Sequence, residues 1–312
     1  MKKLMFVGLF QMVCLMTLAT VTNAATWEVP EDFPTIQVAI DNPAVIDGDK
    51  IQVAAGNYAG ALVRKSLEIK GSDGSVINSG PKHGSGKIMG FRMMAGSDGA
   101  TISHLTFEVD FPVMNGEGAD NITVTQNIMK NSIQGVSNWR GNGWEISHNT
   151  FQDLRVDNGG GIAILVGDYI GGVVGENVIS HNIIVGTLMV PPTDGGGYNG
   201  SGIVLYADFR WGALGASMIS LNRITKNKVS VTVPANPAGV GFVACELTES
   251  RESDPNVALV ITDNSVGFND FRGTELQIVL TPESLDNPIN SISRNLGENR
   301  GHGLSPKLFK AE

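Results

Sequence analysis

Carboxylates stand just beyond three short apolar segments that each begin with glycine. The chemistry open to such groups is general acid–base catalysis or calcium binding, and neighbouring aromatic rings can stack on sugars. Should the three segments lie side by side, the carboxylates and rings would form a sugar-binding corner, with Asp208 and Glu246 as candidate acid and base or calcium ligands. The alternative is solvated loop charge. The candidate binding residues are Tyr206, Asp208, Arg210, Trp211, Asp168 and Glu246.

Histidine and cysteine offer two further chemistries. His148 and His181 occupy equivalent positions in a repeated pattern, with His104 two repeats earlier. Stacked imidazoles could bind zinc or copper, but no third ligand is evident, so no metal site is expected. Cys245 is expected on an outward strand face, either as a reactive thiol or, with no base indicated nearby, as a small hydrophobic residue.

A six-residue pattern repeats seven times and indicates the elements that position these residues. It reads aliphatic, Ser or Thr, any residue, Asn, any residue, apolar, and the first copy has Leu105 in place of Asn. Successive copies are 22, 22, 33, 40, 42 and 31 residues apart, as in a coil with a fixed core and variable loops. The asparagines of the later copies are Asn127, Asn149, Asn182, Asn222, Asn264 and Asn295.

These spacings predict an all-β fold, a single-stranded right-handed parallel β-helix. Each coil is expected to contain a strand before the Asn, a strand after it and a glycine-led strand, stacked on the next coil at roughly 4.8 Å. The six asparagines are expected to form one ladder. Asn tolerates the left-handed backbone that a tight bend needs, and its amide can hydrogen-bond to the next coil.

Both ends of the coil are expected to be capped. Thr35 can cap the N-terminus of a short helix over 36–41, and Leu304, Leu308 and Phe309 could cover the last coil. The charged start, apolar middle and small residues of 1–24 predict a signal peptide. Residues 25–312 are then expected to form one exported β-helix domain that is secreted, periplasmic or on the cell surface.

Charge and hydropathy narrow the class of partner. The formal net charge is −9 without a basic run, which argues against nucleic acid. After residue 24, no segment is long and apolar enough to span a membrane.

The opening of the expected domain resembles that of a known superfamily. Asp32-Phe33-Pro34-Thr35-Ile36-Gln37-x-Ala39-Ile40, followed by Gly48-Asp49-Lys50-Ile51-Gln52-Val53-Ala54-x-Gly56-x-Tyr58, resembles the start of pectate-lyase-like β-helix proteins. The Asn repeats resemble those of carbohydrate-binding and sugar-hydrolase β-helices. The resemblance implies a β-helix that binds polysaccharide along one sheet, but the superfamily contains several enzyme classes and non-enzymes.

The glycine-led strands are expected to form the floor of that groove, with long loops as its walls. Alternation turns Ile162 inward and Ala163, Leu165, Val204 and Cys245 outward. Such a floor lacks the calcium-binding carboxylates and basic residue of a uronate lyase and the paired carboxylates of a hydrolase. Arg300-Gly301-His302-Gly303 looks like a polygalacturonase motif, but the acidic motifs of that family are missing upstream.

The leading hypothesis is therefore an exported protein that binds polysaccharide or another glycan, with no cofactor assigned and calcium as an unsupported option. One alternative is a lyase, epimerase or glycoside hydrolase that uses the Asp208 corner. The other is a structural or adhesion protein without a ligand.

Overall fold

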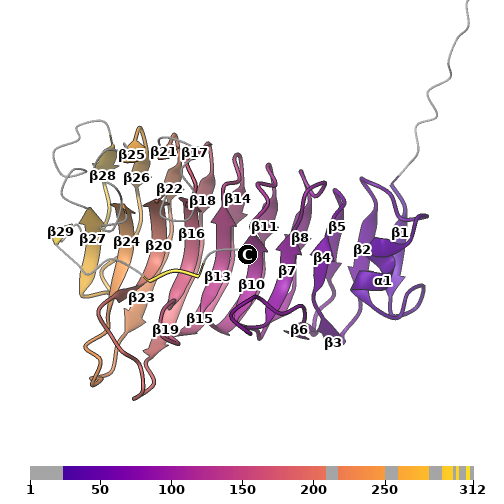
Figure 1. Ribbon diagram of the computed structural model, residues 1–312, viewed down its shortest axis with the longest axis horizontal. Helices are drawn as coiled ribbons and strands as arrows, with labels where there is room; N and C mark the ends of the chain where they lie inside the picture. The colour runs from indigo at the N-terminus through magenta and orange to yellow at the C-terminus, as the bar shows by residue number, and fades with distance from the viewer. Residues whose placement is uncertain are drawn as a thin grey trace, which may run out of the picture.

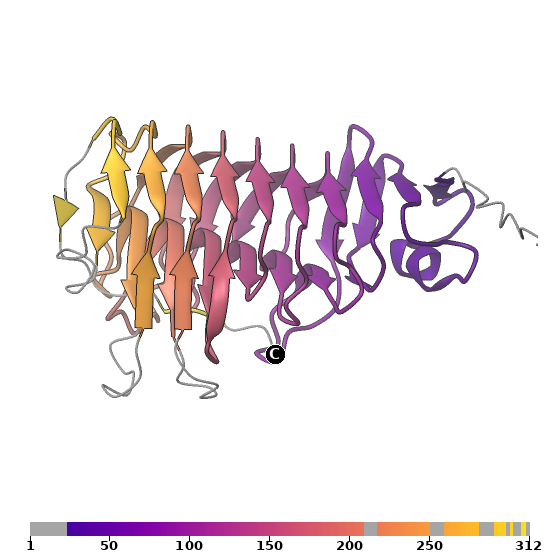
Figure 2. The same cartoon turned by 90° about the horizontal axis from the view of Figure 1, so that it is seen from above.

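The computed structural model describes residues 24–208, 217–249, 259–280, 290–297, 300–301 and 307–309. Over these residues the chain is a right-handed parallel β-helix, an elongated stack of coils with a short helix at the N-terminal end (Figures 1 and 2). The predicted fold class is therefore confirmed. Four parallel sheets run along the stack within the described ranges.

The ten-stranded sheet contains β1 (Thr26–Val29), β2 (Lys50–Val53), β5 (Glu68–Gly71), β8 (Thr101–Ser103), β11 (Thr123–Thr125), β14 (Glu145–Ser147), β18 (Val178–Ser180), β22 (Arg223–Thr225), β26 (Ser265–Gly267) and β28 (Ser291–Ser293). The seven-stranded sheet contains β3 (Gly56–Ala59), β6 (Ser75–Ser79), β9 (Thr106–Phe107), β12 (Ile128–Ser132), β15 (Thr150–Arg155), β19 (Ile183–Met189) and β23 (Lys228–Thr232).

The nine-stranded sheet contains β4 (Ala61–Val63), β7 (Met89–Met93), β10 (Phe111–Asn115), β13 (Gln134–Trp139), β16 (Ile162–Asp168), β20 (Asn199–Ala207), β24 (Gly241–Glu249), β27 (Leu276–Leu280) and β29 (Arg300–Gly301). The three-stranded sheet contains β17 (Gly172–Gly175), β21 (Ser217–Ser220) and β25 (Leu259–Thr262).

Aliphatic and aromatic residues at matching register fill the inside of the coils. Ile102, Val124 and Ile146 are paired neighbours in the ten-stranded sheet, and all three are fully buried. In the seven-stranded sheet, Met129 pairs in register with both Phe107 and Phe151, and all three side chains are fully buried. Each such side chain contributes about 1.5–3 kcal/mol of hydrophobic free energy on burial, so the repeated columns hold the coils together.

The predicted asparagines form two ladders instead of one. Side-chain amides join Asn127, Asn149, Asn182, Asn227, Asn269 and Asn295 at 2.9–3.1 Å between the ten-stranded and seven-stranded sheets. Asn115, Asn138, Asn177, Asn222, Asn264 and Asn290 form a second ladder at the same distances. Asn222 and Asn264 were therefore assigned to the wrong column.

The reason for that error is a second Asn five residues away in each later coil. Asn222 and Asn264 belong to the second ladder, and Asn227 and Asn269 belong to the first. Each Asn occupies a turn of its own, so either member of a pair fits a repeated pattern. The Asn itself was also expected to take the left-handed conformation in the bend, but at the first ladder another residue does so. It is the residue before it, such as His181 with φ 56° or Lys226 with φ 58°, while the Asn supplies the hydrogen bonds.

The N-terminal cap follows the prediction. Helix α1 (Ile36–Asp41) begins after Thr35, whose Oγ1 accepts a hydrogen bond from the Val38 amide at 3.2 Å. Ile36, Ala39 and Ile40 are buried in the main core, so the helix closes the first coil.

The C-terminal segment does not cap the last coil as predicted. The segment 307–309 instead runs in front of the middle strands of the nine-stranded sheet (Figure 1), and Leu308 and Phe309 pack against the apolar cluster on the outer face of that sheet. Leu304 lies outside the described residues. The physical reason is that the middle strands carry an outward apolar cluster that these two side chains cover.

Candidate functional site

A cavity of about 400 Å3, with mostly polar and charged lining residues, lies where strands of the seven-stranded sheet turn toward the nine-stranded sheet. It spans the ends of β9, β12 and β15. The lining residues are Ile88, Glu108, Val109, Asp110, Lys130, Asn131, Gln152, Asp153 and Arg155. Carboxylates, amides and cations thus converge on one concave surface, as they do in binding sites.

Strand register places one polar side chain per coil at this surface. Phe107, Met129 and Phe151 point into the core, so the residue after each of them points outward. Those residues are Glu108, Lys130 and Gln152, and Lys130 pairs in register with Gln152. Lys130 Nζ lies 3.2 Å from Glu108 Oε1, and both side chains are nearly half exposed.

Two left-handed residues then turn the chain around the cavity. Asn131 has φ 53° and Asp153 has φ 54°. Asp153 Oδ1 accepts a hydrogen bond from the Thr187 amide at 2.9 Å. Gly186, with φ 102°, leaves room for this carboxylate, because a Cβ there would lie 2.3 Å from Asp153 Oδ1. The carboxylate is thereby fixed at the wall of the cavity.

Arg155 ties three coils together at the back of the cavity. Its guanidinium forms an ion pair with Asp110, and its Nε donates to the Asn131 carbonyl oxygen at 3.0 Å. Asp110 Oδ2 also accepts from the Ile88 amide at 2.6 Å. Burial lowers the pKa of Arg155, and the nearby charge of Asp157 offsets only part of this effect. The guanidinium nevertheless remains charged at neutral pH.

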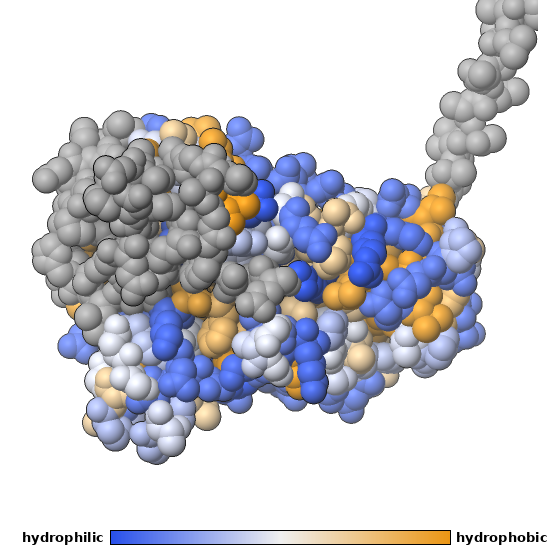
Figure 3. Space-filling model, in the orientation of Figure 1, coloured by the Kyte–Doolittle hydropathy of each residue, from blue (hydrophilic) through white to orange (hydrophobic). Residues whose placement is uncertain are grey.

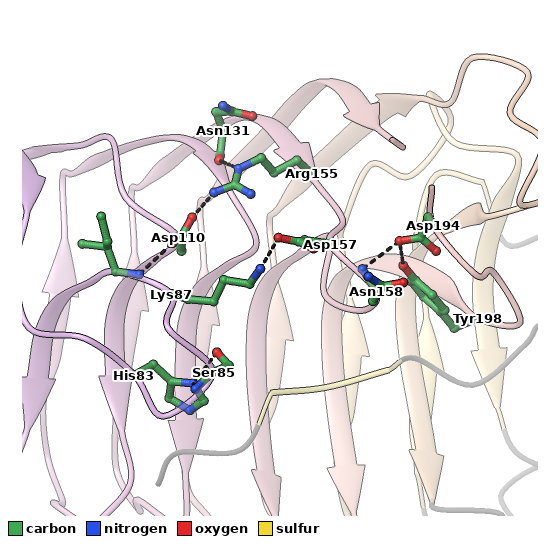
Figure 4. A network of polar contacts seen from close by, with 11 residues as sticks. His83, Ser85, Lys87, Asp110, Asn131, Arg155, Asp157, Asn158, Asp194 and Tyr198 are labelled. Carbon is green, nitrogen blue, oxygen red and sulfur yellow. Dashed lines mark hydrogen bonds and ion pairs between the residues drawn. The ribbon is translucent and has the colours of Figure 1, made fainter. Parts of the chain in front are cut away.

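A row of polar contacts extends from this cavity along the stack (Figure 4). Lys87 forms an ion pair with Asp157. Asp194 Oδ2 accepts from the Asn158 amide at 2.8 Å and from Tyr198 Oη at 2.6 Å. Loops that are far apart in the sequence are therefore joined on one side of the molecule.

The pKa of Asp194 reflects this environment. Burial raises the pKa, but hydrogen bonds from Tyr198, Gly196 and Asn158 and the charge of Lys307 lower it by more, so the net pKa lies below the ordinary value of 3.8. Burial and, after it, the hydrogen bond to Asp194 raise the pKa of Tyr198. Asp194 is therefore a carboxylate, and Tyr198 a neutral hydroxyl donor, at neutral pH.

The outer face of the nine-stranded sheet, the expected groove floor, is covered over its middle strands. Leu165 and Val204 face outward as predicted, and with Trp139 and Tyr206 they form an apolar cluster against which Leu308 and Phe309 pack. Phe309 also hydrogen-bonds through its backbone to the Gln134 side chain. On the face that Figure 3 shows, the described surface is largely hydrophilic with smaller hydrophobic areas.

Alternation failed in two of these strands, β16 and β24. Ala163 and its neighbour Ile164 both contact the main core, whereas Ile162 belongs to the outer cluster. Cys245 also faces the main core and is fully buried. The predicted inward and outward assignments of Ile162, Ala163 and Cys245 are therefore wrong, because two consecutive residues turn inward and break the period of two.

Burial also settles the state of the Cys245 thiol. Desolvation and the nearby charge of Glu246 raise its pKa. The thiol is protonated at neutral pH, which fits a small hydrophobic residue better than a nucleophile.

The predicted corner is buried where it is described. Tyr206 Oη donates to Asp208 Oδ2 at 3.1 Å, and these two side chains are 2% and 0% exposed. Glu246 is 0% exposed and lies in register with Val204. Arg210 and Trp211 lie outside the described residues. The structure thus brings Tyr206 and Asp208 together, and sugar binding by this group stays a prediction.

Asp168 occupies the neighbouring coil. Its Oδ2 accepts from the Gly171 amide at 2.7 Å, and its Oδ1 lies 3.9 Å from Arg140 Nε. The Asp208 amide donates to its carbonyl oxygen at 3.0 Å. Asp168 therefore holds a loop and an arginine in place next to the corner.

The histidines stack as expected. The rings of His148 and His181 are 4.8 Å apart and 4° from parallel. Burial, His148 and Lys226 lower the pKa of His181. Across the described ranges, no group of three or more His, Cys, Asp or Glu side chains is arranged to hold a metal ion. Of the motif at Arg300, only Arg300 and Gly301 are described.

Glu108, Lys130 and Gln152 were missed by the sequence analysis, although a signal for them was present. Each directly follows an apolar residue of the repeat, so alternation alone would have placed all three outward in adjacent coils. Asp110 and Arg155 gave no such signal, because they are 45 residues apart.

Comparison with known proteins adds little to this geometry. No family model and no curated protein matches the chain. An alginate lyase structure from Paenibacillus sp. str. FPU-7 is similar at 14% identity and a TM-score of 0.31, over 89% of this chain and 99% of that one. A pectin methylesterase in complex with a hexasaccharide is similar at 16% identity and a TM-score of 0.30, over 81% of this chain and 80% of that one. TM-scores this low carry no conclusion about function.

The fold itself agrees with the resemblance seen in the sequence. The coils, their parallel register and the Asn ladders are those of a right-handed parallel β-helix. In the part of the chain that is described, no helix is long and apolar enough to cross a membrane.

Proposed function

We propose that this chain binds a polysaccharide or another glycan in the cavity lined by Glu108, Lys130 and Gln152. The observation that carries the proposal is the presentation of one polar side chain per coil on a concave surface of about 400 Å3. The coils repeat at roughly 4.8 Å, so the cavity offers donors and acceptors at regular intervals to an extended chain of hydroxyl groups. The resemblance of the Asn repeats to those of carbohydrate-binding and sugar-hydrolase β-helices supports the same ligand class.

Binding is favoured over catalysis by the contacts of the three carboxylates. Glu108 faces Lys130, Asp110 faces Arg155, and Asp153 accepts from the Thr187 amide. Each carboxylate is thus already engaged by a donor of the protein, whereas a catalytic acid or base must be directed at its substrate. The cavity is therefore better suited to hold a ligand than to cleave one.

The test compares two double variants on a panel of neutral and acidic polysaccharides. Lys130→Ala with Gln152→Ala removes the paired cation and amide of the cavity. Gln52→Ala with Lys70→Ala is the matched control, because Gln52 and Lys70 are also paired in register, on the ten-stranded sheet. After the panel has identified a ligand, calorimetry should show at least a tenfold loss of affinity for the first variant and less than a twofold change for the control.

Two results would overturn the proposal: no glycan bound by the unmodified protein, or equal losses in both variants. Release of sugar products during incubation would instead indicate one of the enzyme classes.

We also propose export, on the basis of the N-terminal sequence. The charged, apolar and small-residue regions of 1–24 support cleavage near Ala24. Sequencing the N-terminus of the protein recovered outside the cytoplasm should begin at Ala25. A full-length chain retained in the cytoplasm would refute it.

A further inference from the structure

A second cavity, of about 300 Å3, lies on the outer face of the ten-stranded sheet and shares no lining residue with the glycan cavity. It spans β18, β22, β26 and β28. Its lining is Ser180, His181, Arg223, Thr225, Lys226, Ser265, Gly267, Phe268 and Ser293. Hydroxyl and basic groups dominate this lining, and no carboxylate belongs to it.

The hollow arises from one glycine in a column of hydroxyl residues. Ser180, Thr225, Gly267 and Ser293 are neighbours in register across the four strands. Gly267 alone lacks a side chain, so a gap opens between Thr225 and Ser293. The hydroxyl groups on either side of that gap can donate hydrogen bonds into it.

The two basic residues of the lining lie at the two ends of β22, which forms the floor of the hollow. Arg223 begins β22, and Lys226 follows it in a left-handed conformation, with both side chains exposed. Phe268 forms a wall at the next coil, and the Arg294 guanidinium lies 5.3 Å from the centre of its ring. Positive charge therefore stands on the coils of β22 and β28, with the coil of β26 between them.

These charges are not neutralised by neighbouring carboxylates. Over the residues that the structure describes, neither Arg223 nor Lys226 lies within ion-pair distance of a carboxylate. Glu176 and Asp263 sit in the turns that precede β18 and β26, at the end of the strands where Arg223 begins β22 and away from Lys226. Asp270 is engaged by Arg272 at 2.8 Å. In a chain of net charge −9, a hollow lined by an arginine and a lysine and by no carboxylate is a specific feature.

We propose that this hollow binds a tetrahedral oxyanion, a sulfate or phosphate group, between Arg223 and Lys226. The two cations supply charge, and the hydroxyls of Thr225, Ser265 and Ser293 supply hydrogen bonds to the oxygens. The group can belong to a free ion or to an ester on a larger molecule, since the recognition chemistry is the same. The site involves none of the residues of the glycan cavity, so it stands independently of the proposed function.

His181 offers the bound anion a hydrogen-bond donor and not a positive charge. Burial, His148 and Lys226 lower its pKa, so the imidazole is neutral at pH 7 and offers one N–H. Its ring lies at the rim of the hollow and is a convenient spectroscopic reporter of occupancy.

The experiment is a titration of the full chain with sodium sulfate and with sodium phosphate at constant ionic strength maintained with sodium chloride. Binding is followed by NMR of the His181 imidazole and by calorimetry. We expect a saturable response that sodium chloride does not produce. Arg223→Ala with Lys226→Ala should weaken it at least tenfold, whereas Arg223→Lys with Lys226→Arg should retain it within about threefold.

A charge-matched control variant and a comparison of ligands complete the experiment. Arg64→Ala with Lys70→Ala removes the same net charge elsewhere and should leave the affinity unchanged. A sulfated oligosaccharide that binds more tightly than its desulfated form and than inorganic sulfate would assign the site to sulfate esters, and equal affinity for sulfate alone would assign it to the free ion. A non-saturable response, or equal losses in the variant and the control, would overturn the proposal.

Discussion

Gln134 and Phe309 form a two-way pair of hydrogen bonds although 175 residues separate them. The Phe309 amide donates to Gln134 Oε1 at 2.6 Å, and Gln134 Nε2 donates to the Phe309 carbonyl oxygen at 3.1 Å. Trp139 Nε1 donates to the same carbonyl oxygen at 3.2 Å. The C-terminal segment is therefore fixed to β13 in the middle of the nine-stranded sheet.

The first prediction concerns this attachment. Phe309→Ala removes the ring that lies 5.4 Å from the Phe111 ring and part of the cover over the outer apolar cluster. We expect a loss of about 1–2 kcal/mol in the free energy of unfolding and a red-shifted tryptophan emission as Trp139 becomes hydrated. Urea unfolding and fluorescence measure both. Leu221→Ala, at a side chain that is 59% exposed, is the control; an equal loss there would refute the attachment.

The second prediction concerns the interior of the first Asn ladder. Asn182→Ala removes a side chain that accepts from Asn149 and donates to Asn227 and to the Ile146 carbonyl oxygen, all buried. Because buried groups on both neighbours lose their partners, we expect a destabilisation of about 3 kcal/mol or more. The exposed Asn78, which donates to Asn57, should cost less than about 1 kcal/mol when changed to Ala. Similar urea midpoints for the two variants would contradict the ladder's role.

The third prediction separates backbone strain from a specific clash at the glycan cavity. Gly186→Ala forces a Cβ within 2.3 Å of Asp153 Oδ1, whereas Gly197→Ala, also at positive φ, meets no atom within 4 Å. Both variants carry strain, but only the first displaces the carboxylate. We expect Gly186→Ala to be less stable than Gly197→Ala by about 1–3 kcal/mol and to bind the glycan more weakly. Equal stability and affinity would show that Asp153 is not held as described.

The fourth prediction concerns acid sensitivity through Asp194. Its pKa is lowered below 3.8 in the folded chain, so folding favours the carboxylate. The resulting stability is present above the unfolded pKa of about 3.8 and is lost as the pH falls through the lower folded value. Asp194→Asn should therefore make the melting temperature less dependent on pH below about 4, whereas the exposed Asp73→Asn should not. Identical slopes for Asp194→Asn and the unmodified chain would exclude this contribution.

The sequence by itself determined the repeating architecture and its N-terminal cap. Columns such as Ile102, Val124 and Ile146 follow from the periodic pattern, since identical positions of stacked coils must meet. Thr35 capping α1 needed only local chemistry. The outward placement of Lys130 and Gln152 was also available from alternation, which depends only on neighbours along the strand.

Tertiary structure decided what depends on which coils and loops meet. Asn222 and Asn227 look alike in sequence, and only the stacking of the coils assigns each to its ladder. Loop lengths vary from coil to coil, so Arg155 meeting Asp110 and Phe309 meeting Gln134 had no local signal. Contacts of that kind depend on the path of the whole chain, because distant segments are brought together only after the coils have stacked.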